Sequence, residues 1–180
     1  MTHIKHEALL GPPGSGKTWY INEELKKDER FGFKTASTGV AALIATDDEN
    51  IMGRTIHSVL RFVHPWQLKE NIKTGKINKT LAWIASNYDR LIIDEISMIS
   101  AELFDLIVYA VNEYNSDGRN IPLKLLVVGD FLQLPPISMK EEEPALPAFM
   151  GEYWKDFEIN KLTEIRRQDN SEFLEVIKAI

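Results

Sequence analysis

The sequence predicts one α/β domain, a three-layer α/β/α sandwich around a mostly parallel sheet. Three observations support this prediction. A glycine-rich segment, Gly11–Thr18, lies between a short apolar run and a stretch with helical spacing. Two more apolar runs, at 91–93 and 123–128, have no polar alternation, which is typical of strands buried on both faces. Between these two runs, residues 103–111 carry an apolar stripe at helical spacing.

Length and composition bound the class of protein. The chain has 180 residues, of which 44% are hydrophobic and 27% are charged, as in ordinary globular proteins. It contains no cysteine, so disulfides and thiolate metal sites are excluded. No apolar run approaches the roughly 18 residues of a membrane span, and the N-terminus lacks the apolar core of a signal peptide. We therefore expect an intracellular protein without a membrane partner.

Residues 11–18 read GPPGSGKT and match in full the phosphate-binding template of Gly, four residues, Gly, Lys and Thr. In such a loop the backbone N–H groups point at phosphate oxygens, and the N-terminus of the next helix adds to the attraction. Lys17 would reach the β- and γ-phosphates, and the Thr18 hydroxyl would bind Mg²⁺. A turn that ends in Lys-Thr by chance is the alternative, which the strand–loop–helix context disfavours. The residues expected to bind the nucleotide are Gly11, Pro12, Pro13, Gly14, Ser15, Gly16, Lys17 and Thr18.

A second short strand is expected at 31–36, followed by a hydroxyl-rich turn and a helix of small residues at 37–44. Backbone N–H groups at the start of that helix, with the hydroxyls of Ser37 and Thr38, can hold a second anion such as a nucleic-acid phosphate. Capping of the helix by Ser37 or Thr38 explains the same residues equally well. The local sequence leaves both interpretations open.

Residues 61–80 place an aromatic side chain close in sequence to a row of lysines. Trp66 is followed by Lys69, Lys73, Lys76 and Lys79. Such a stretch can bind nucleic acid, because the ring stacks on a base while the lysines pair with phosphates. A half-buried Trp66 beside a solvated lysine face is commoner, and the sequence alone favours it. The net charge of −6 argues against a surface that attracts nucleic acid everywhere, but it allows a local basic track.

The predicted strand at 88–95 ends in two adjacent carboxylates, Asp94 and Glu95. In a parallel sheet the carboxyl ends of the strands border the ligand crevice, so both side chains are expected near the phosphate loop. There Asp94 can hold Mg²⁺ through its water shell, and Glu95 can polarise an attacking water. A buried strand that ends in an acidic turn is the alternative, and the upstream phosphate loop disfavours it.

The strand at 123–128 leads into the segment GDFLQLPP at 129–136. The Gln133 amide can both donate and accept, so it can touch a γ-phosphate oxygen and the attacking water together. A plain strand-to-loop transition is the alternative, which only the other motifs disfavour. Towards the C-terminus we expect a further strand at 159–165 and an amphipathic helix at 171–180.

Six sequence segments, taken in order, resemble motifs of the superfamily 1 helicases. They are GPPGSGKT, TASTGVAA, TIHS, LIIDEISM, VVGDFLQLPP and LTEIRRQ. The similarity is greatest to the petite-integration-frequency (Pif) branch, related to the RecD and Dda helicases, which move 5′ to 3′ on single-stranded DNA. It runs from about Leu9 to the C-terminus. The resemblance implies that residues 1–180 are one RecA-like motor domain. The second motor domain is expected to be absent, and that domain or a partner chain would complete the site.

The resemblance also implies roles for single residues. Lys17 and Thr18 would serve the phosphates and Mg²⁺, Asp94 would hold Mg²⁺, Glu95 would be the general base, and Gln133 would sense the γ-phosphate. Arg167 in LTEIRRQ matches the arginine finger, a group that can be worth about 10³ to 10⁵ in rate.

DNA contacts follow from the same resemblance. Thr38, Gly39 and His57 lie in motifs that contact the DNA strand in the family. The segment at 61–80 falls where the family has a small insertion with a strand-separating wedge, and Pro65 and Trp66 are the candidates for that contact.

We therefore expect an ATP-dependent DNA helicase motor domain of the 5′ to 3′ type, which binds and hydrolyses Mg-ATP and contacts single-stranded DNA. One alternative is a non-hydrolysing, nucleotide-gated module that binds DNA or a protein partner. The presence of Glu95 and Gln133 argues against it. The other is a small-molecule phosphotransferase with a phosphate loop, which would leave GDFLQLPP and TASTGVAA without roles.

Overall fold

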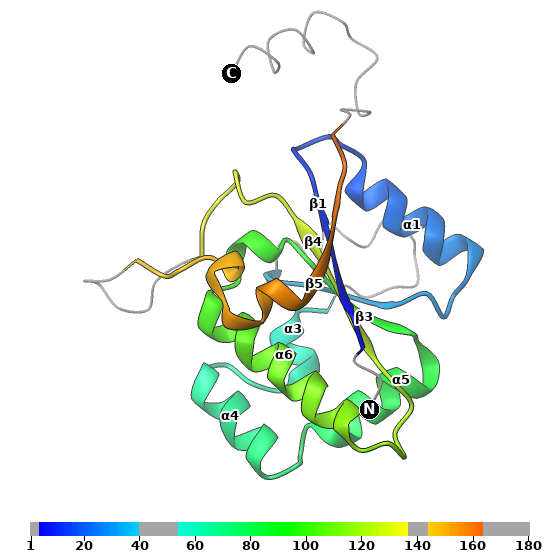
Figure 1. Ribbon diagram of the computed structural model, residues 1–180, viewed down its shortest axis with the longest axis vertical. Helices are drawn as coiled ribbons and strands as arrows, with labels where there is room; N and C mark the ends of the chain where they lie inside the picture. The colour runs from blue at the N-terminus through cyan, green and yellow to red at the C-terminus, as the bar shows by residue number, and fades with distance from the viewer. Residues whose placement is uncertain (1–3, 40–53, 137–143, 164–180) are drawn as a thin grey trace, which may run out of the picture.

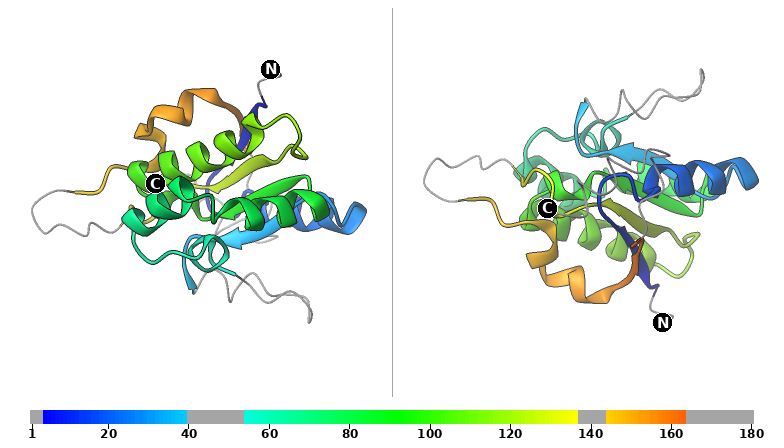
Figure 2. Two further views of the ribbon diagram at one scale, coloured as in Figure 1. Left: turned by 90° about the horizontal axis from the view of Figure 1, so that it is seen from below. Right: turned by 90° about the horizontal axis from the view of Figure 1, so that it is seen from above.

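The computed structural model describes residues 4–39, 54–136 and 144–163. Within them, five strands form a single all-parallel sheet in the order β2-β3-β4-β1-β5. Helices cover both faces (Figure 1, Figure 2), which confirms the predicted α/β/α sandwich. The strands are β1 His6–Leu10, β2 Phe33–Ala36, β3 Arg90–Asp94, β4 Lys124–Gly129 and β5 Phe157–Lys161.

Helix α1 covers one face of the sheet, and the other described α-helices lie on the opposite side (Figure 1). The Ser100 hydroxyl starts the longest helix by accepting a hydrogen bond from the Leu103 N–H at 3.3 Å, as its place before an apolar stripe predicts. The α-helices are α1 Lys17–Lys27, α3 Ile56–Leu60, α4 Pro65–Lys73, α5 Asn78–Asn87 and α6 Ala101–Ser116. Short 3₁₀ helices are η1 Ile96–Met98, η2 Ala148–Met150 and η3 Glu152–Asp156. None of the described helices is long and apolar enough to cross a membrane.

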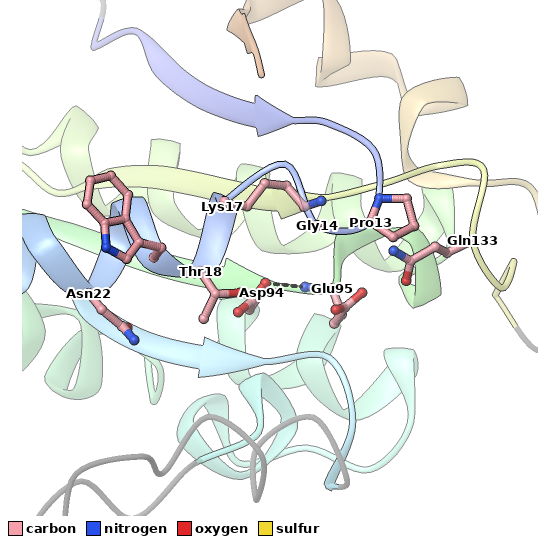
Figure 3. Close-up of a pocket in the computed structure, with 10 residues that line it drawn as sticks. Pro13, Gly14, Lys17, Thr18, Asn22, Asp94, Glu95 and Gln133 are labelled. Carbon is pink, nitrogen blue, oxygen red and sulfur yellow. Dashed lines mark hydrogen bonds between the residues drawn. The ribbon is translucent and has the colours of Figure 1, made fainter. Parts of the chain in front are cut away.

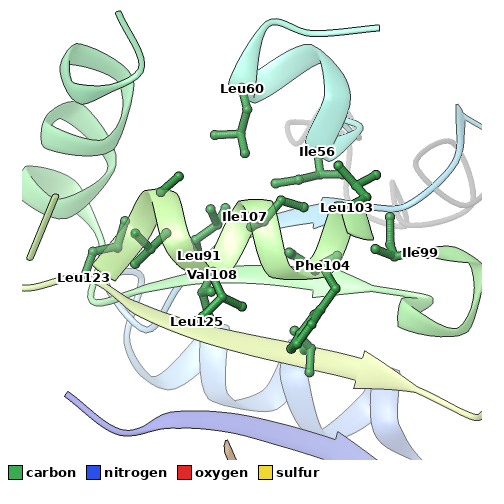
Figure 4. Packing of buried hydrophobic residues seen from close by; sticks show 14 of the residues in the cluster. Ile56, Leu60, Leu91, Ile99, Leu103, Phe104, Ile107, Val108, Leu123 and Leu125 are labelled. Carbon is green, nitrogen blue, oxygen red and sulfur yellow. The ribbon is translucent and has the colours of Figure 1, made fainter. Parts of the chain in front are cut away.

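The central strands are buried on both faces, which explains why their sequences are apolar without alternation. On one face, Leu91 and Leu125 pack with α6 in the larger core, together with Phe104 and Ile107 (Figure 4). On the other face a smaller cluster packs against α1 and contains Leu9, Ile21, Ile92, Leu126 and Val128. The two cores therefore pack β3 and β4 from both faces, and the residues that leave their carboxyl ends start from these packed strands.

Strand β5 differs from the expected strand at 159–165, because it begins two residues earlier, at Phe157. Phe157 is buried, and its ring lies 5.2 Å from the ring of Phe104 and 5.8 Å from that of Trp154. This aromatic packing fixes the start of the strand, which then pairs with β1 from His6 to Leu10. The helix expected at 171–180 lies outside the described residues.

Candidate functional site

The loop between β1 and α1 has the backbone shape that phosphate binding requires. Gly14 and Gly16 have φ angles of 77° and 89°, in the left-handed region that glycine tolerates best. The Ser15 N–H donates to the Pro12 carbonyl at 3.2 Å and closes the turn. Gly16 is also the N-cap of α1, so the N–H groups at the start of that helix face the loop.

Gly11 is required for a different reason, namely close approach to its neighbours. A Cβ atom there would lie 2.6 Å from the Ser15 hydroxyl oxygen and 2.7 Å from the Leu162 carbonyl oxygen. The Gly11 N–H also donates to the Gly129 carbonyl at 3.2 Å. That bond ties the phosphate loop to the end of β4, where the segment 129–136 begins.

The Lys17 ammonium lies across its own loop. Its Nζ donates to the carbonyl oxygens of Gly11 at 2.6 Å and Pro12 at 3.0 Å. Thr18 follows in the first turn of α1, and Figure 3 shows its side chain beside Asp94. The cation and the hydroxyl are therefore both at the loop, as the sequence predicted.

Asp94 ends β3 and is held in two ways. Its Oδ1 accepts a hydrogen bond from the Glu95 N–H at 3.0 Å, and its Oδ2 lies 3.9 Å from the Lys34 Nζ. Both side chains of this ion pair are largely buried, at 8% exposure for Lys34 and 15% for Asp94. Burial raises the pKa of Asp94 above its ordinary value, and the Lys34 charge is the largest opposing effect.

No role was predicted for Lys34 from the sequence. Strands β2 and β3 pair with Ala36 opposite Asp94. Residues two apart in a strand share a face, so Lys34 lies on the same face of the sheet as Ala36 and Asp94. A charged residue inside a four-residue strand was the signal that could have singled it out.

Glu95 turns the chain away from β3 with a φ of 57°, in the left-handed region that non-glycine residues seldom adopt. Such a conformation costs about 1 kcal/mol or more, so the packing around it must hold it in place. Burial raises the pKa of Glu95, the nearby Asp94 charge raises it further, and Lys17 opposes both effects.

Gln133 is placed by a tight turn after β4. Asp130 is buried, its Oδ1 accepts from the Leu132 N–H at 3.0 Å, and its carbonyl oxygen accepts from the Gln133 N–H at 3.1 Å. These bonds hold the backbone of the turn, and Figure 3 shows the Gln133 side chain pointing towards Glu95. Asp130 received no role from the sequence, although an Asp that opens a loop is a recognised turn signal.

The side chains from these separate segments line one pocket of about 640 Å³ (Figure 3). Two further side chains, Trp19 and Asn22, line it without having been predicted, and both are on α1 directly after the phosphate loop. Of the predicted nucleotide-binding residues, Gly11, Pro12 and Ser15 do not line the pocket and support the loop from behind. The pocket is lined by Pro13, Gly14, Gly16, Lys17, Thr18, Trp19, Asn22, Asp94, Glu95 and Gln133.

The predicted DNA-contact residues lie outside this pocket. Thr38 and Gly39 follow the carboxyl end of β2, and Gly39 is exposed. His57 is on α3, where its ring lies 4.6 Å from that of Phe62 and burial lowers the pKa of the imidazole. Most of the helix expected after Thr38 lies outside the described residues, so anion binding and capping both stay predictions.

Pro65 and Trp66 open helix α4. The Trp66 side chain is 65% exposed, so the expectation of a half-buried ring is wrong. The four lysines that follow it do not lie on one helix, because Lys69 and Lys73 are on α4, Lys76 lies between the helices, and Lys79 is on α5. Arg167 lies outside the described residues.

Comparisons with known proteins point to one family. A family model described as PIF1-like helicase matches residues 8–178. A protein of Campylobacter jejuni named ATP-dependent DNA helicase Pif1 is 33% identical over 92% of this chain, and the human PIF1 protein is 31% identical over 96%. The match spans only 38% and 26% of those two relatives. A crystal structure of a Bacteroides Pif1 helicase with ADP-AlF3 and ssDNA has a TM-score of 0.71 and 26% identity, covering 97% of this chain and 42% of that one.

Proposed function

Because this chain belongs to the PIF1-like helicase family, we propose that it is an ATP-hydrolysing motor domain of a DNA helicase. The chain spans well under half of the relatives it matches, so unwinding, 5′ to 3′ movement and action on single-stranded DNA are all part of the proposal. The observation that carries it is the gathering of the phosphate loop, Asp94, Glu95 and Gln133 around one pocket.

Binding of the nucleotide falls to the loop and to Lys17. Backbone N–H groups at the start of α1 would face the phosphates, and the helix N-terminus favours their negative charge. The Lys17 ammonium would exchange its carbonyl partners for phosphate oxygens, which form stronger charge-assisted hydrogen bonds.

The residues fit a Mg²⁺ ion that is held partly by the nucleotide. Thr18 and Asp94 offer two oxygen ligands on the pocket wall, and no group of three or more His, Cys, Asp and Glu among the described residues could hold a metal alone. Mg²⁺ commonly binds in this way, through one or two carboxylates together with substrate phosphates. When bound, it would neutralise charge on the β- and γ-phosphates.

Hydrolysis requires a water in line with the bond between the γ-phosphorus and the bridging oxygen. Glu95 would take a proton from this water as the oxygen attacks phosphorus, and ADP would leave with the bridging oxygen. The raised pKa of Glu95 makes it a stronger base than an exposed glutamate. Gln133, on the same wall, would orient the water and touch the γ-phosphate. Arg167, or a cation from a second motor domain or partner chain, would stabilise the transferred phosphoryl group.

The DNA contacts are proposed for Thr38, Gly39 and His57, with Pro65 and Trp66 as the wedge. The exposure of Trp66 supports the last assignment, because a strand-separating side chain must be free to meet a base pair.

ATP turnover by this chain, with and without a single-stranded oligonucleotide at two salt concentrations, tests the proposal. Glu95→Gln is the negative control, because it keeps the shape of the side chain and removes the base. We expect turnover that the oligonucleotide stimulates, and stimulation that falls as salt rises. Tight ATP binding without turnover would instead favour the non-hydrolysing module.

A further inference from the structure

A second pocket, of about 600 Å³, lies at the β2 edge of the sheet, away from the nucleotide pocket. We call it the α3–α5 groove, because α3, α5 and the segments that flank them form most of its wall. Four cationic side chains and two aromatic rings dominate the lining, namely Arg54, Arg61, Lys76, Lys79, Trp83 and Phe33. The hydroxyl side chains of Ser58 and Thr80 complete its polar wall.

Among the described residues, the groove is lined by positive charge without a facing carboxylate. Its lining contains no Asp or Glu, and none of its four cations forms an ion pair with any described residue. Other cations on this chain do find carboxylates, such as Lys69 with Glu102 and Arg90 with Glu7. In a chain of net charge −6, four such cations around one groove indicate a polyanionic ligand.

Arg61 is held in the groove by its backbone. It is the C-cap of α3 and has a φ of 55°, in a position where glycine or asparagine is usual. Its carbonyl oxygen accepts a hydrogen bond from the Asn71 side chain at 3.1 Å, which ties it to α4. An arginine in this conformation is unfavourable for folding, so a role in binding gives a reason for it.

Trp83 provides a firm aromatic surface. Its side chain is 51% exposed, while the ring of Phe33 meets it edge-on at 5.6 Å and that of Tyr88 lies 6.1 Å away. Lys79 and Thr80 lie one helical turn before it on α5, so they share its face. Braced on one side and open on the other, the indole suits stacking of a nucleobase.

We propose that the α3–α5 groove binds a nucleic-acid strand, with Trp83 stacked on a base and the four cations paired with neighbouring phosphates. The inference rests on the proposed function in that the polymer is the DNA on which the motor acts. It adds a second surface, because neither His57 nor Trp66 lines the groove. The combination of cations with an exposed ring favours a nucleic acid over an acidic protein, which would need only the charges.

The first experiment measures binding of a fluorescein-labelled oligothymidylate by anisotropy over a range of salt concentrations. The test variant is Lys76→Ala with Lys79→Ala, and the control is Lys26→Ala with Lys27→Ala, which removes the same charge from the exposed end of α1. We expect the test variant to bind about tenfold more weakly at low salt. Its slope of log Kd against log salt should fall by about 1.4, since each single-strand phosphate contact contributes about 0.7. The control should stay within about twofold of wild type.

The second experiment tests stacking with Trp83→Phe, which keeps a ring against Phe33 and Tyr88. A thermal melt confirms that the variant is folded. We expect binding to weaken about fivefold with the salt slope unchanged, because stacking releases no counterions. Quenching of tryptophan fluorescence by the oligonucleotide should also fall.

Three results would overturn the inference. If wild type binds the strand and the Lys76/Lys79 variant matches the control, the groove is not the site, and the proposed function is unaffected. If polyglutamate displaces the oligonucleotide as well as unlabelled DNA does, the groove recognises charge alone and suits an acidic protein. If wild type binds no strand even at low salt, both this inference and the proposed DNA contacts fail.

Discussion

The buried ion pair between Lys34 and Asp94 makes a sharp prediction about stability. The two charged atoms lie 3.9 Å apart, and both side chains are largely buried. At an effective permittivity of 20, Coulomb attraction over this distance is about 4 kcal/mol. Lys34→Met removes the cation, keeps much of the side-chain volume, and leaves the Asp94 carboxylate buried without its partner.

We expect Lys34→Met to lower the free energy of unfolding at neutral pH by about 3 kcal/mol, the lower end of the range for breaking a buried pair. In a domain of this size that corresponds to a fall in Tm of roughly 6 to 12 °C. The Lys34 charge opposes the rise in the pKa of Asp94, so the variant should have a still higher pKa at this carboxyl.

The sign of the pH effect follows from this pKa. A carboxyl whose pKa is higher in the folded than in the unfolded chain holds more protons when folded, so its contribution to stability falls as pH rises above its ordinary value of 3.8. The destabilisation by Lys34→Met should therefore be largest near pH 7 and shrink as pH falls through the raised pKa.

Urea unfolding followed by circular dichroism at pH 7 and pH 5 measures both effects. Asp94→Asn supplies the control, because in that background Lys34→Met should cost much less. A loss below about 0.5 kcal/mol at pH 7, or the same loss in the Asp94→Asn background, would refute the reasoning.

Three other predictions concern the nucleotide site and the wedge. Glu95→Gln should lower ATP turnover by about 10² to 10⁴-fold while nucleotide affinity changes little. Wild-type turnover should fall as acid protonates Glu95 at its raised pKa. Equal losses in turnover and binding would argue against a general base. Gly11→Ala should destabilise the fold by about 1 to 3 kcal/mol and weaken nucleotide binding, because the alanine methyl group would clash with Ser15 and the Leu162 carbonyl. An unchanged melting temperature would contradict this prediction. Trp66→Ala, in a protein that carries both motor domains, should slow DNA unwinding more than ATP hydrolysis. Equal loss of both rates would contradict the proposal that Trp66 is part of the wedge.

The sequence predicted those parts of the proposed nucleotide site that depend on local chemistry. The phosphate loop needs glycines at defined positions, and Gly14 and Gly16 have the left-handed angles that its spacing implies. Asp94 and Glu95 could be placed because parallel strands end at a shared edge, so a carboxylate after a buried strand lies near the ligand.

Contacts between distant segments could not be predicted in this way. The order β2-β3-β4-β1-β5 places β4 between the phosphate-loop strand and β3, and no local pattern specifies that order. The ion pair of Lys34 with Asp94 depends on the pairing of β2 with β3. The sequence also associated the lysines with Trp66, whereas Lys76 and Lys79 share the α3–α5 groove with Trp83.

By itself, therefore, the sequence determined the class of fold, the segments that line the proposed nucleotide pocket and the family resemblance, because backbone conformation and hydrophobic period are properties of neighbouring residues. Only the tertiary structure decided which side chains share a wall of the pocket, which charges are paired and which aromatic rings are open. The physical reason is that these properties depend on how strands and helices far apart in the chain pack together. The spacing of residues along the sequence does not specify which of these elements become neighbours.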